Sequence, residues 1–196
     1  MTYAPFDLSG KVALVTGGNR GIGMGMAEAL AASNASIAVW GRKEAANKAA
    51  VEALSGLGTG EVKAWSVDVA DEQAVIDATS EVVSSMGRID SCFANAGVGF
   101  GAPSFIEMSS ETWRKKMAVN LDGAFWTLRE SVKHMVERAK AGDPGGSVVG
   151  VASLAGVEGA ARNQAYAATK GGLPAMIRGI AVEHGRYGIR ANSILP

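Results

Sequence analysis

The 196-residue sequence contains a single cysteine, Cys92, and only two histidines, His134 and His184. One cysteine cannot form an internal disulfide, and so few cysteine and histidine residues offer no zinc-type cluster. Aromatic residues make up 6% of the chain, and no run approaches the roughly 20 apolar residues of a membrane span. The sequence therefore predicts no disulfide framework, no resident metal and no membrane-spanning segment.

The chain also lacks an excess of charge of either sign, because 19 Lys and Arg balance 19 Asp and Glu. Nucleic acids and anionic membranes select basic surfaces, so this balance disfavours both as partners. The first eight residues do not combine a basic segment with an apolar run, as a secretory signal does. We therefore expect a cytoplasmic protein.

Hydrophobic residues, by contrast, make up 47% of the chain, which excludes a disordered polymer. Short β-branched runs alternate with longer segments rich in Ala, Glu, Lys, Leu and Met. The expected strands are Val12–Thr16, Ser36–Trp40, Val62–Val67, Ser91–Ala94, Ser147–Val151 and Arg190–Leu195. The expected helices are Ile22–Ala32, Lys43–Leu54, Asp71–Met86, Ser110–Lys140 and Ala165–Tyr187. This alternation predicts βαβ units and an α/β fold with a parallel sheet covered on both faces, in a single domain over residues 1–196.

Glycine is abundant, at 26 residues, and three glycines stand where the first strand turns into the first helix. The segment Thr16–Gly23 has the spacing Gly-x-x-x-Gly-x-Gly. Gly17, Gly21 and Gly23 would let backbone N–H groups approach a pyrophosphate at the positive end of the helix. The alternative is a tight strand–helix turn that binds no ligand.

The tip of the second strand carries cations in place of the acid that often binds an adenosine ribose. Arg42 and Lys43 follow Gly41 there, and Arg20 lies in the glycine turn. An arginine pairs well with a 2′-phosphate, so this chemistry favours NADP(H). Alternatively, Arg42 and Lys43 begin a solvated helix. Asp68 could accept from an adenine amino group while Val69 packs on the ring, or Asp68 could cap the next helix.

Tyr166 and Lys170 lie four residues apart in an expected helix, so both side chains share one face. Ionising an ordinary tyrosine at pH 7 costs about 4 kcal/mol. An ammonium about 4 Å away offsets a comparable amount at an effective dielectric of about 20. Lys170 could therefore make Tyr166 a usable acid/base, although the same spacing also occurs in solvated helix pairs.

Three further polar residues lie beside expected strand ends or within helices. Ser153 follows the fifth strand at its carboxyl end, where open parallel sheets place ligands, or it is a turn residue. Asn95 follows the fourth strand and could join neighbouring strand ends. Asn120 lies inside an expected helix, where asparagine is unfavourable unless it bonds something, or it belongs to an ordinary polar face.

These residues together resemble the short-chain dehydrogenase/reductase family over essentially the whole chain. The matching motifs are Thr16-Gly-x-x-x-Gly-Ile-Gly23, Asp68, Asn95-Ala-Gly97, Asn120, and Ser153 with Tyr166-x-x-x-Lys170. The resemblance implies a Rossmann-like, doubly wound parallel sheet in three layers. It also implies an NADP-dependent enzyme, with NAD as the alternative cofactor, that interconverts a small-molecule ketone and a secondary alcohol.

The same resemblance implies a role for each site residue. Tyr166 would be the general acid/base, Ser153 would stabilise the reacting oxygen, Lys170 would bind the nicotinamide ribose and tune Tyr166, and Asn120 would hold a water in a proton relay. The implied cofactor-binding positions are Gly17, Asn19, Arg20, Gly21, Ile22, Gly23, Arg42, Asp68, Val69, Asn95, Ala96, Gly97, Tyr166 and Lys170. A homotetramer or homodimer is implied as well, with the two longest helices facing a partner.

Family members normally continue for roughly another fifty residues beyond the position of Pro196, so we expect a last helix and strand to be missing. A dinucleotide-binding or scaffold protein, or an inactive fragment without turnover, is therefore the alternative function. The expected walls of the substrate site are mostly apolar, and they allow a modest ketone, an acyl thioester or a sugar. They are Val98, Phe100, Phe105, Leu154, Val157 and Asn163.

Overall fold

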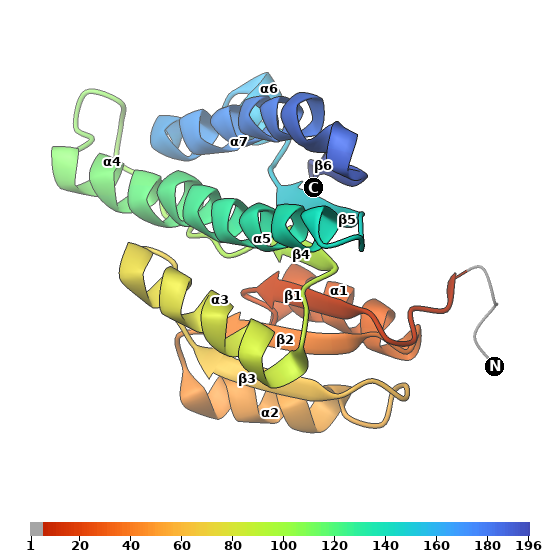
Figure 1. Ribbon diagram of the computed structural model, residues 1–196. Coiled ribbons are helices and arrows are strands. Elements are labelled where there is room, and N and C mark those ends of the chain that lie inside the picture. Colours follow the sequence, from red (N-terminus) through yellow and green to blue (C-terminus); the bar gives the residue numbers. More distant parts are fainter. Residues whose placement is uncertain (1–5) are drawn as a thin grey trace.

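The computed structural model describes residues 6–196, which form a parallel sheet flanked by helices (Figure 1). Residues 1–5, part of the segment considered for a secretory signal, lie outside the described residues. The strands are β1 (Val12–Thr16), β2 (Ser36–Gly41), β3 (Val62–Ser66), β4 (Ser91–Ala94), β5 (Gly146–Val151) and β6 (Ile189–Ile194). All pairs are parallel, in the order β3-β2-β1-β4-β5-β6. The predicted Rossmann-like α/β fold is confirmed.

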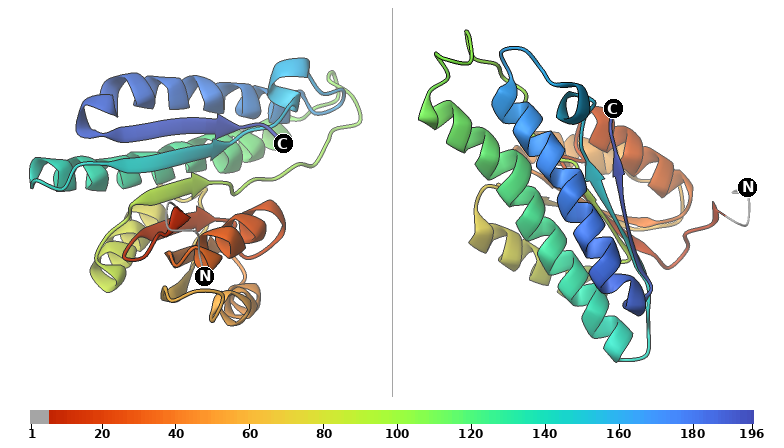
Figure 2. Two further views of the ribbon diagram at one scale, coloured as in Figure 1. Left: turned by 90° about the vertical axis from the view of Figure 1, so that its right-hand side faces the viewer. Right: turned by 90° about the horizontal axis from the view of Figure 1, so that it is seen from above.

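The helices are α1 (Gly21–Ala32), α2 (Glu44–Leu54), α3 (Glu72–Met86), α4 (Ser110–Met117), α5 (Gly123–Lys140), α6 (Ala155–Glu158) and α7 (Gln164–His184), with a π-turn η2 (Ala118–Asp122) and a 3₁₀ turn η3 (Gly185–Tyr187). Helices α3, α5 and α7 cover one face, and α1 and α2 cover the other (Figures 1 and 2). Successive residues of a strand point to opposite faces, so Leu14 joins the core under α5 and Val15 the core under α1.

Burial along the strands follows this layering. Every residue of β1 is buried, as predicted for a strand covered on both faces. In β6, however, exposed residues alternate with more buried ones, so the same prediction is wrong for this strand. The reason is that α7 packs on one face of β6, and no helix within residues 6–196 covers the other.

The helix predicted over Ser110–Lys140 is not a single α-helix. It is interrupted at η2, where Asn120 turns its side chain to the backbone of Val98 on a neighbouring loop. A π-turn inserts one residue into a helix and is common at functional sites. The end of the last predicted helix is a 3₁₀ turn, and the short helix α6 was not predicted. Other boundaries differ by one or two residues.

The strand order reverses at β1, whose neighbours are β2 on one side and β4 on the other. Crossover connections leave in opposite directions from this point, so a crevice opens at the carboxyl ends of β1 and β4. The loops that follow β1, β2, β4 and β5 therefore meet along one edge of the sheet. Among residues 6–196, no helix combines the length and the apolar character that a membrane span requires.

Candidate active site

The carboxyl ends of β1 and β4 are joined by Thr16 and Asn95. The Thr16 hydroxyl donates to the Phe93 carbonyl (3.3 Å) and accepts from the amides of Asn95 and Ala96 (3.0 Å each). The Asn95 side-chain amide donates to the Thr16 carbonyl at 2.9 Å. Asn95 therefore joins neighbouring strand ends, as predicted. The organising role of the Thr16 hydroxyl was missed, because a threonine at a strand end is unremarkable in sequence.

The glycine-rich turn leaves the start of α1 open. Gly17 (φ 65°) and Gly21 (φ 54°) adopt left-handed backbone conformations, which disfavour other residues. A Cβ at Gly23 would collide with the Gly17 carbonyl, whereas one at Gly21 would meet no atom within 4 Å. The residue that precedes α1, Arg20, makes no side-chain capping bond, and the first turn holds no acid. The first amides of α1 can therefore serve an external anion.

A cavity of about 580 Å³ extends from this turn across the ends of β1, β2 and β4. Its volume lies within the usual range for cofactor and ligand pockets. The predicted cofactor positions that line it are Gly17, Asn19, Arg20, Gly21, Ile22, Arg42, Asp68, Val69, Asn95, Ala96 and Gly97. Gly23, Tyr166 and Lys170 do not line it. An open helix start and an adjoining cavity of this volume fit a dinucleotide.

Arg42 and Asp68 face each other at the β2–β3 end of this cavity. The Arg42 guanidinium lies 3.7 Å from the Asp68 carboxylate, with 60% and 48% of the two side chains exposed. Such an exposed pair contributes little to stability. The alternative that Asp68 caps α3 is wrong, because Asp71 caps it and Asp68 accepts from the Ala70 amide. Val69 is buried at the cavity wall.

Lys170 is a buried cation on α7. Its side chain is 4% exposed, and Nζ donates to the Val151 carbonyl at 2.6 Å. Within residues 6–196 it forms no ion pair with a carboxylate. Burial lowers the pKa of Lys170 to about 8, so the ammonium remains charged at neutral pH. Nζ lies 5.6 Å from the centre of the Tyr166 ring, which confirms that the two side chains share a helix face.

Asn120 and Gly97 lie beside this lysine. Asn120 Oδ1 accepts from the Val98 amide (2.8 Å), and Nδ2 donates to the Val98 carbonyl (3.0 Å). A Cβ at Gly97 would lie 3.3 Å from Asn120 Oδ1 and 3.7 Å from Lys170 Nζ. Gly97 therefore allows three segments far apart in the sequence to meet. The interpretation of Asn120 as an ordinary polar face is wrong, because the residue is only 1% exposed.

Ser153 lies just beyond the carboxyl end of β5. Its hydroxyl donates to the Pro196 carbonyl and accepts from the Ala155 amide, both at 3.3 Å. The helix that follows packs on α7, and a Cβ at Gly156 would lie 2.5 Å from the Lys170 carbonyl carbon. The structure thus brings the Ser153 segment against the helix that carries Tyr166. Among the described residues, no hydrogen bond joins the Ser153 and Tyr166 hydroxyls.

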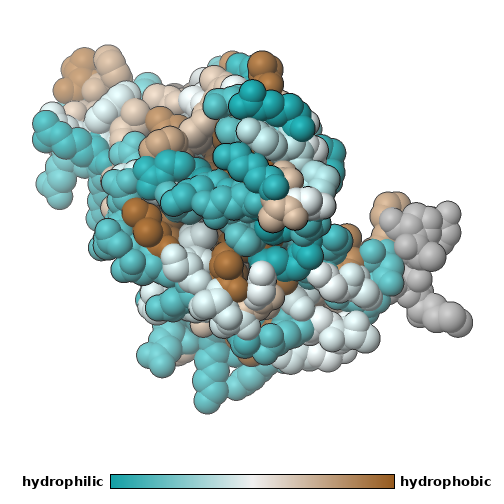
Figure 3. Space-filling view, in the orientation of Figure 1, coloured by the Kyte–Doolittle hydropathy of each residue, from teal (hydrophilic) through white to brown (hydrophobic). Residues whose placement is uncertain are grey.

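The predicted substrate walls are mostly open to solvent. Val98 lines the cavity, but the side chains of Phe100, Phe105, Leu154 and Val157 are exposed. The loop between β4 and α4, at the upper left in Figure 1, coincides with a hydrophobic patch in Figure 3. Its exposed apolar side chains are Phe100, Phe105 and Ile106.

A second buried cation, Lys116 on α4, contacts both the loop that contains Phe100 and the segment that contains Asn163. Its Nζ donates to Asn163 Oδ1 and lies 4.9 Å from the centre of the Phe100 ring. The side chain is fully buried, and burial lowers its pKa. Lys116 was not among the predicted site residues, because a lysine within Arg114-Lys-Lys116 is typical of a solvated helix face.

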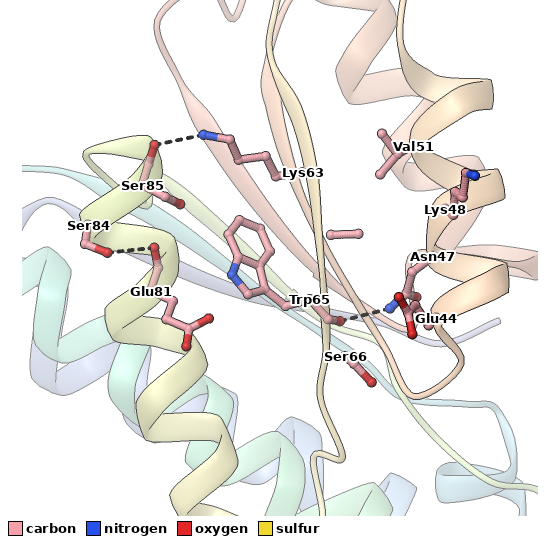
Figure 4. Close-up of a pocket in the computed structure, with 11 residues that line it drawn as sticks. Glu44, Asn47, Lys48, Val51, Lys63, Trp65, Ser66, Glu81, Ser84 and Ser85 are labelled. Atoms are coloured by element: carbon pink, nitrogen blue, oxygen red, sulfur yellow. Dashed lines mark hydrogen bonds between the residues drawn. The ribbon is translucent and has the colours of Figure 1, made fainter.

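A second groove, of about 790 Å³, is larger than the cavity at the carboxyl ends of β1, β2 and β4. It lies beside α2 at the edge strand β3 (Figure 4). The Trp65 ring projects from β3 toward Glu81 on α3, and the residues of α2 that line the groove lie on the other side of the strand. None of the predicted site residues lines this groove.

Comparison with known proteins gives consistent matches. The sequence model of a family described as "short chain dehydrogenase" matches residues 11–196. A 2,5-dichloro-2,5-cyclohexadiene-1,4-diol dehydrogenase of Sphingobium indicum is 34% identical over 190 residues, which cover 97% of this chain and 73% of the relative. A 3-oxoacyl-[acyl-carrier-protein] reductase of Chlamydia pneumoniae is 33% identical, with 96% and 73% covered. The crystal structure of an NAD⁺-bound xylitol dehydrogenase superimposes with a TM-score of 0.89 at 33% identity, covering 96% of this chain and 70% of that one.

Proposed function

Because the chain belongs to the short-chain dehydrogenase family, we propose that it binds NADP(H) and interconverts a ketone and a secondary alcohol, with Tyr166 as the general acid/base. The observation that carries this proposal is Lys170. It is a cation buried to 96% without a carboxylate partner among the described residues, on the same helix face as a tyrosine. Leaving a buried charge uncompensated is costly, and such groups cluster at functional sites.

The dinucleotide, when bound, supplies or accepts the hydride. In the proposed reaction the Tyr166 hydroxyl donates a proton to the carbonyl oxygen during reduction and accepts it during oxidation. The Lys170 ammonium stabilises the phenolate that remains, because an opposite charge nearby favours the ionised form. Ser153 donates a hydrogen bond to the reacting oxygen. Asn120 fixes the loop at Val98 beside Lys170 and, on this proposal, holds a water that returns the proton.

The preference for NADP(H) over NAD(H) rests on Arg42 and Arg20 at the wall of the cavity. A 2′-phosphate there would compete with Asp68 for the Arg42 guanidinium, and the present pair is long and exposed. A charge-assisted bond to a phosphate is stronger than such a surface pair. Replacing Arg42 with Asp should therefore shift the ratio of catalytic efficiencies toward NADH, and an unchanged ratio would contradict this assignment.

We also propose a homo-oligomer, as a dimer or tetramer. Helices α4, α5 and α7 present exposed apolar side chains, namely Trp113, Phe125 and Val182. Light scattering coupled to size-exclusion chromatography should give a mass at least twice that of one chain. A mass of a single chain would contradict the proposal.

The test of the catalytic proposal compares Tyr166→Phe with Tyr187→Phe. Tyr187 follows α7 and stacks on His184, away from Lys170, so it is a matched control. With NADPH and a panel of ketones, sugars and acyl thioesters, Tyr166→Phe should lower turnover about 10³-fold. Its NADPH affinity should change little, and Tyr187→Phe should keep full turnover. Undiminished turnover in Tyr166→Phe, or NADPH binding by the wild type without turnover on any carbonyl, would overturn the proposed enzyme.

A further inference from the structure

We infer that Asn47, a residue outside the cofactor cavity, is a positioning residue that fixes which atom of Asn19 faces the adenosine ribose, and that it thereby favours a ribose hydroxyl over a 2′-phosphate. This inference rests on the proposed binding of a dinucleotide. Asn47 lies on α2 and is 4% exposed, and it was not among the predicted site residues. Asn19 lies in the glycine-rich turn and lines the cavity.

The orientation of the Asn47 side chain is set by two backbone carbonyls. Its Nδ2 donates to the Gly41 carbonyl at 2.9 Å and to the Trp65 carbonyl at 3.0 Å, at the ends of β2 and β3. The second of these bonds is drawn in Figure 4. Carbonyl oxygens only accept hydrogen bonds, so the amino group of Asn47 must point toward them. Its oxygen, Oδ1, must then point the other way.

Asn47 Oδ1 in turn sets the orientation of Asn19. The Asn19 Nδ2 donates to Asn47 Oδ1 at 2.7 Å. An amide rotated by half a turn would bring two oxygens together, which leaves this contact without a donor. This bond uses one of the two N–H groups of Asn19 Nδ2 and fixes the orientation of the amide. The amino side of Asn19 therefore faces Asn47, and Oδ1, which has no hydrogen-bond partner among the described residues, lies on the other side of the amide.

Gly41 makes room for this asparagine relay, by which we mean the hydrogen bonds that run from the Gly41 and Trp65 carbonyls through Asn47 to Asn19. A Cβ at Gly41 would lie 2.5 Å from Asn47 Oδ1 and would also collide with the Asn19 amide. The two asparagines thus occupy the space over the end of β2, directly between α2 and the cavity that Gly41 itself lines. A larger residue at position 41 would separate the pair.

The relay has a chemical consequence for the ligand. An amide oxygen accepts a hydrogen bond from a ribose hydroxyl, but it offers no donor to a phosphate and repels its negative charge. Asn19 thus acts against Arg42, which favours a 2′-phosphate. Without Asn47, the Asn19 amide is free to rotate and to present its amino group to a phosphate. One hydrogen bond of this kind changes an affinity about fivefold.

The experiment measures the affinity of ADP-ribose and of 2′-phospho-ADP-ribose by isothermal titration calorimetry. Both probes lack nicotinamide, so they report on the adenosine half of the site without turnover. The variants are Asn47→Ala, Asn19→Ala and the double variant. Leu54→Ala is the matched control, because it removes a buried side chain of the same helix that does not contact the relay.

Asn47→Ala should shift the affinity ratio about fivefold toward the 2′-phosphorylated probe. In the Asn19→Ala background the same substitution should leave the ratio unchanged, because Asn47 acts through Asn19. A role of Asn47 in stability alone would weaken both probes equally, as we expect for Leu54→Ala. If Asn47→Ala does not fold, Asn19→Ala still removes the oxygen and should shift the ratio in the same direction.

A ratio that neither Asn47→Ala nor Asn19→Ala changes would overturn the inference while leaving the proposed function intact. Equal shifts from Asn47→Ala in the presence and absence of the Asn19 side chain would also overturn it. Binding of neither probe by the wild type would overturn both the inference and the proposed cofactor.

Discussion

The two ends of the parallel sheet differ in whether their charged residues are paired with residues of opposite charge. At the amino ends of the strands, Asp90 accepts two hydrogen bonds from Arg88 (2.8 and 2.6 Å) and one from the Val12 amide (3.0 Å), and it lies 3.4 Å from Arg138. Arg138 also pairs with Asp143 at 2.9 Å. These charges are compensated within the protein.

At the carboxyl ends, by contrast, Lys170 and Lys116 are buried with neutral partners only, and Arg42 has one long, exposed partner. Neither buried ammonium pairs with a carboxylate among the described residues, although burying an unpaired charge is costly. The ion pairs at the amino end stabilise the fold, whereas at the carboxyl end we propose that Lys170 and the weakly paired Arg42 serve a ligand and the chemistry.

The largest effect is expected for Lys170→Met. Loss of the ammonium should reduce turnover about 10³-fold. The same change should leave the free energy of unfolding equal or raise it by about 1 kcal/mol at pH 7, because it removes a buried charge. Turnover with NADPH and urea unfolding measure the two effects. A large loss of stability would show that Lys170 is structural.

The counterpart at the amino end is Asp90→Ala. Removing this carboxylate leaves the Val12 amide without its acceptor and leaves Arg88 and Arg138 with Asp143 as their remaining carboxylate partner, which should cost about 3 kcal/mol of unfolding free energy. Burial alone would raise the pKa of Asp90, but the bonds from Arg88 and Val12 hold it below its ordinary value. NADPH affinity should stay within about twofold. The exposed Asp77→Ala should change stability by less than about 0.5 kcal/mol, and a similar loss in both variants would contradict the comparison.

The buried lysine should also make stability depend on pH. The pKa of Lys170 is lowered from 10.5 to about 8, so the unfolded chain binds more protons between these values. Stability should therefore rise with pH across this interval, by about 3 kcal/mol. The measurement is the difference in unfolding free energy between wild type and Lys170→Met at several pH values, which removes the contribution of other groups. A difference that is constant from pH 7 to 10.5 would contradict the lowered pKa.

The smallest effect is expected for Lys116→Met. This substitution keeps the apolar stem and removes the bond to Asn163, so it should change unfolding free energy by no more than about 1 kcal/mol. Because Lys116 joins the segments at Phe100 and Asn163, its loss should speed tryptic cleavage after the exposed Arg162. Peptide mass mapping measures this rate. Arg138→Met, at the amino end of the sheet, is the control. Equal cleavage rates in the wild type and Lys116→Met would contradict the proposal that Lys116 joins the segments at Phe100 and Asn163.

Much of the fold followed from the sequence, because its signals are local. The β-branched runs predicted the strands, their alternation with helical segments predicted the parallel sheet, and the glycine-rich turn predicted the open start of α1. The interruption at η2 was not predicted, because it coincides with bonds from Asn120 to the backbone of Val98, which is 22 residues away and which no local pattern signals. The exposed face of β6 was missed for a similar reason, since covering a strand requires a helix from elsewhere in the chain.

The site was predictable where residue type and spacing suffice. Tyr166 and Lys170 share a helix face because of helical periodicity alone. The burial of Lys116 and the bonds of Asn47 depend on which loops meet, and no spacing in the sequence encodes them. The role of Thr16 likewise appears only when β1 and β4 are seen side by side. The sequence also could not show that the Ser153 and Tyr166 hydroxyls are not joined by a hydrogen bond among the described residues.

The most direct test of the division between the two ends is hydrogen–deuterium exchange with and without NADPH, read peptide by peptide. The account predicts slower exchange in segments 16–23, 40–43, 95–98 and 151–170 on addition of NADPH. Segments 88–90 and 138–143 should exchange at unchanged rates. No protection anywhere, or protection centred on the ion pairs around Asp90, would contradict the claim that the uncompensated charges at the carboxyl ends serve a dinucleotide.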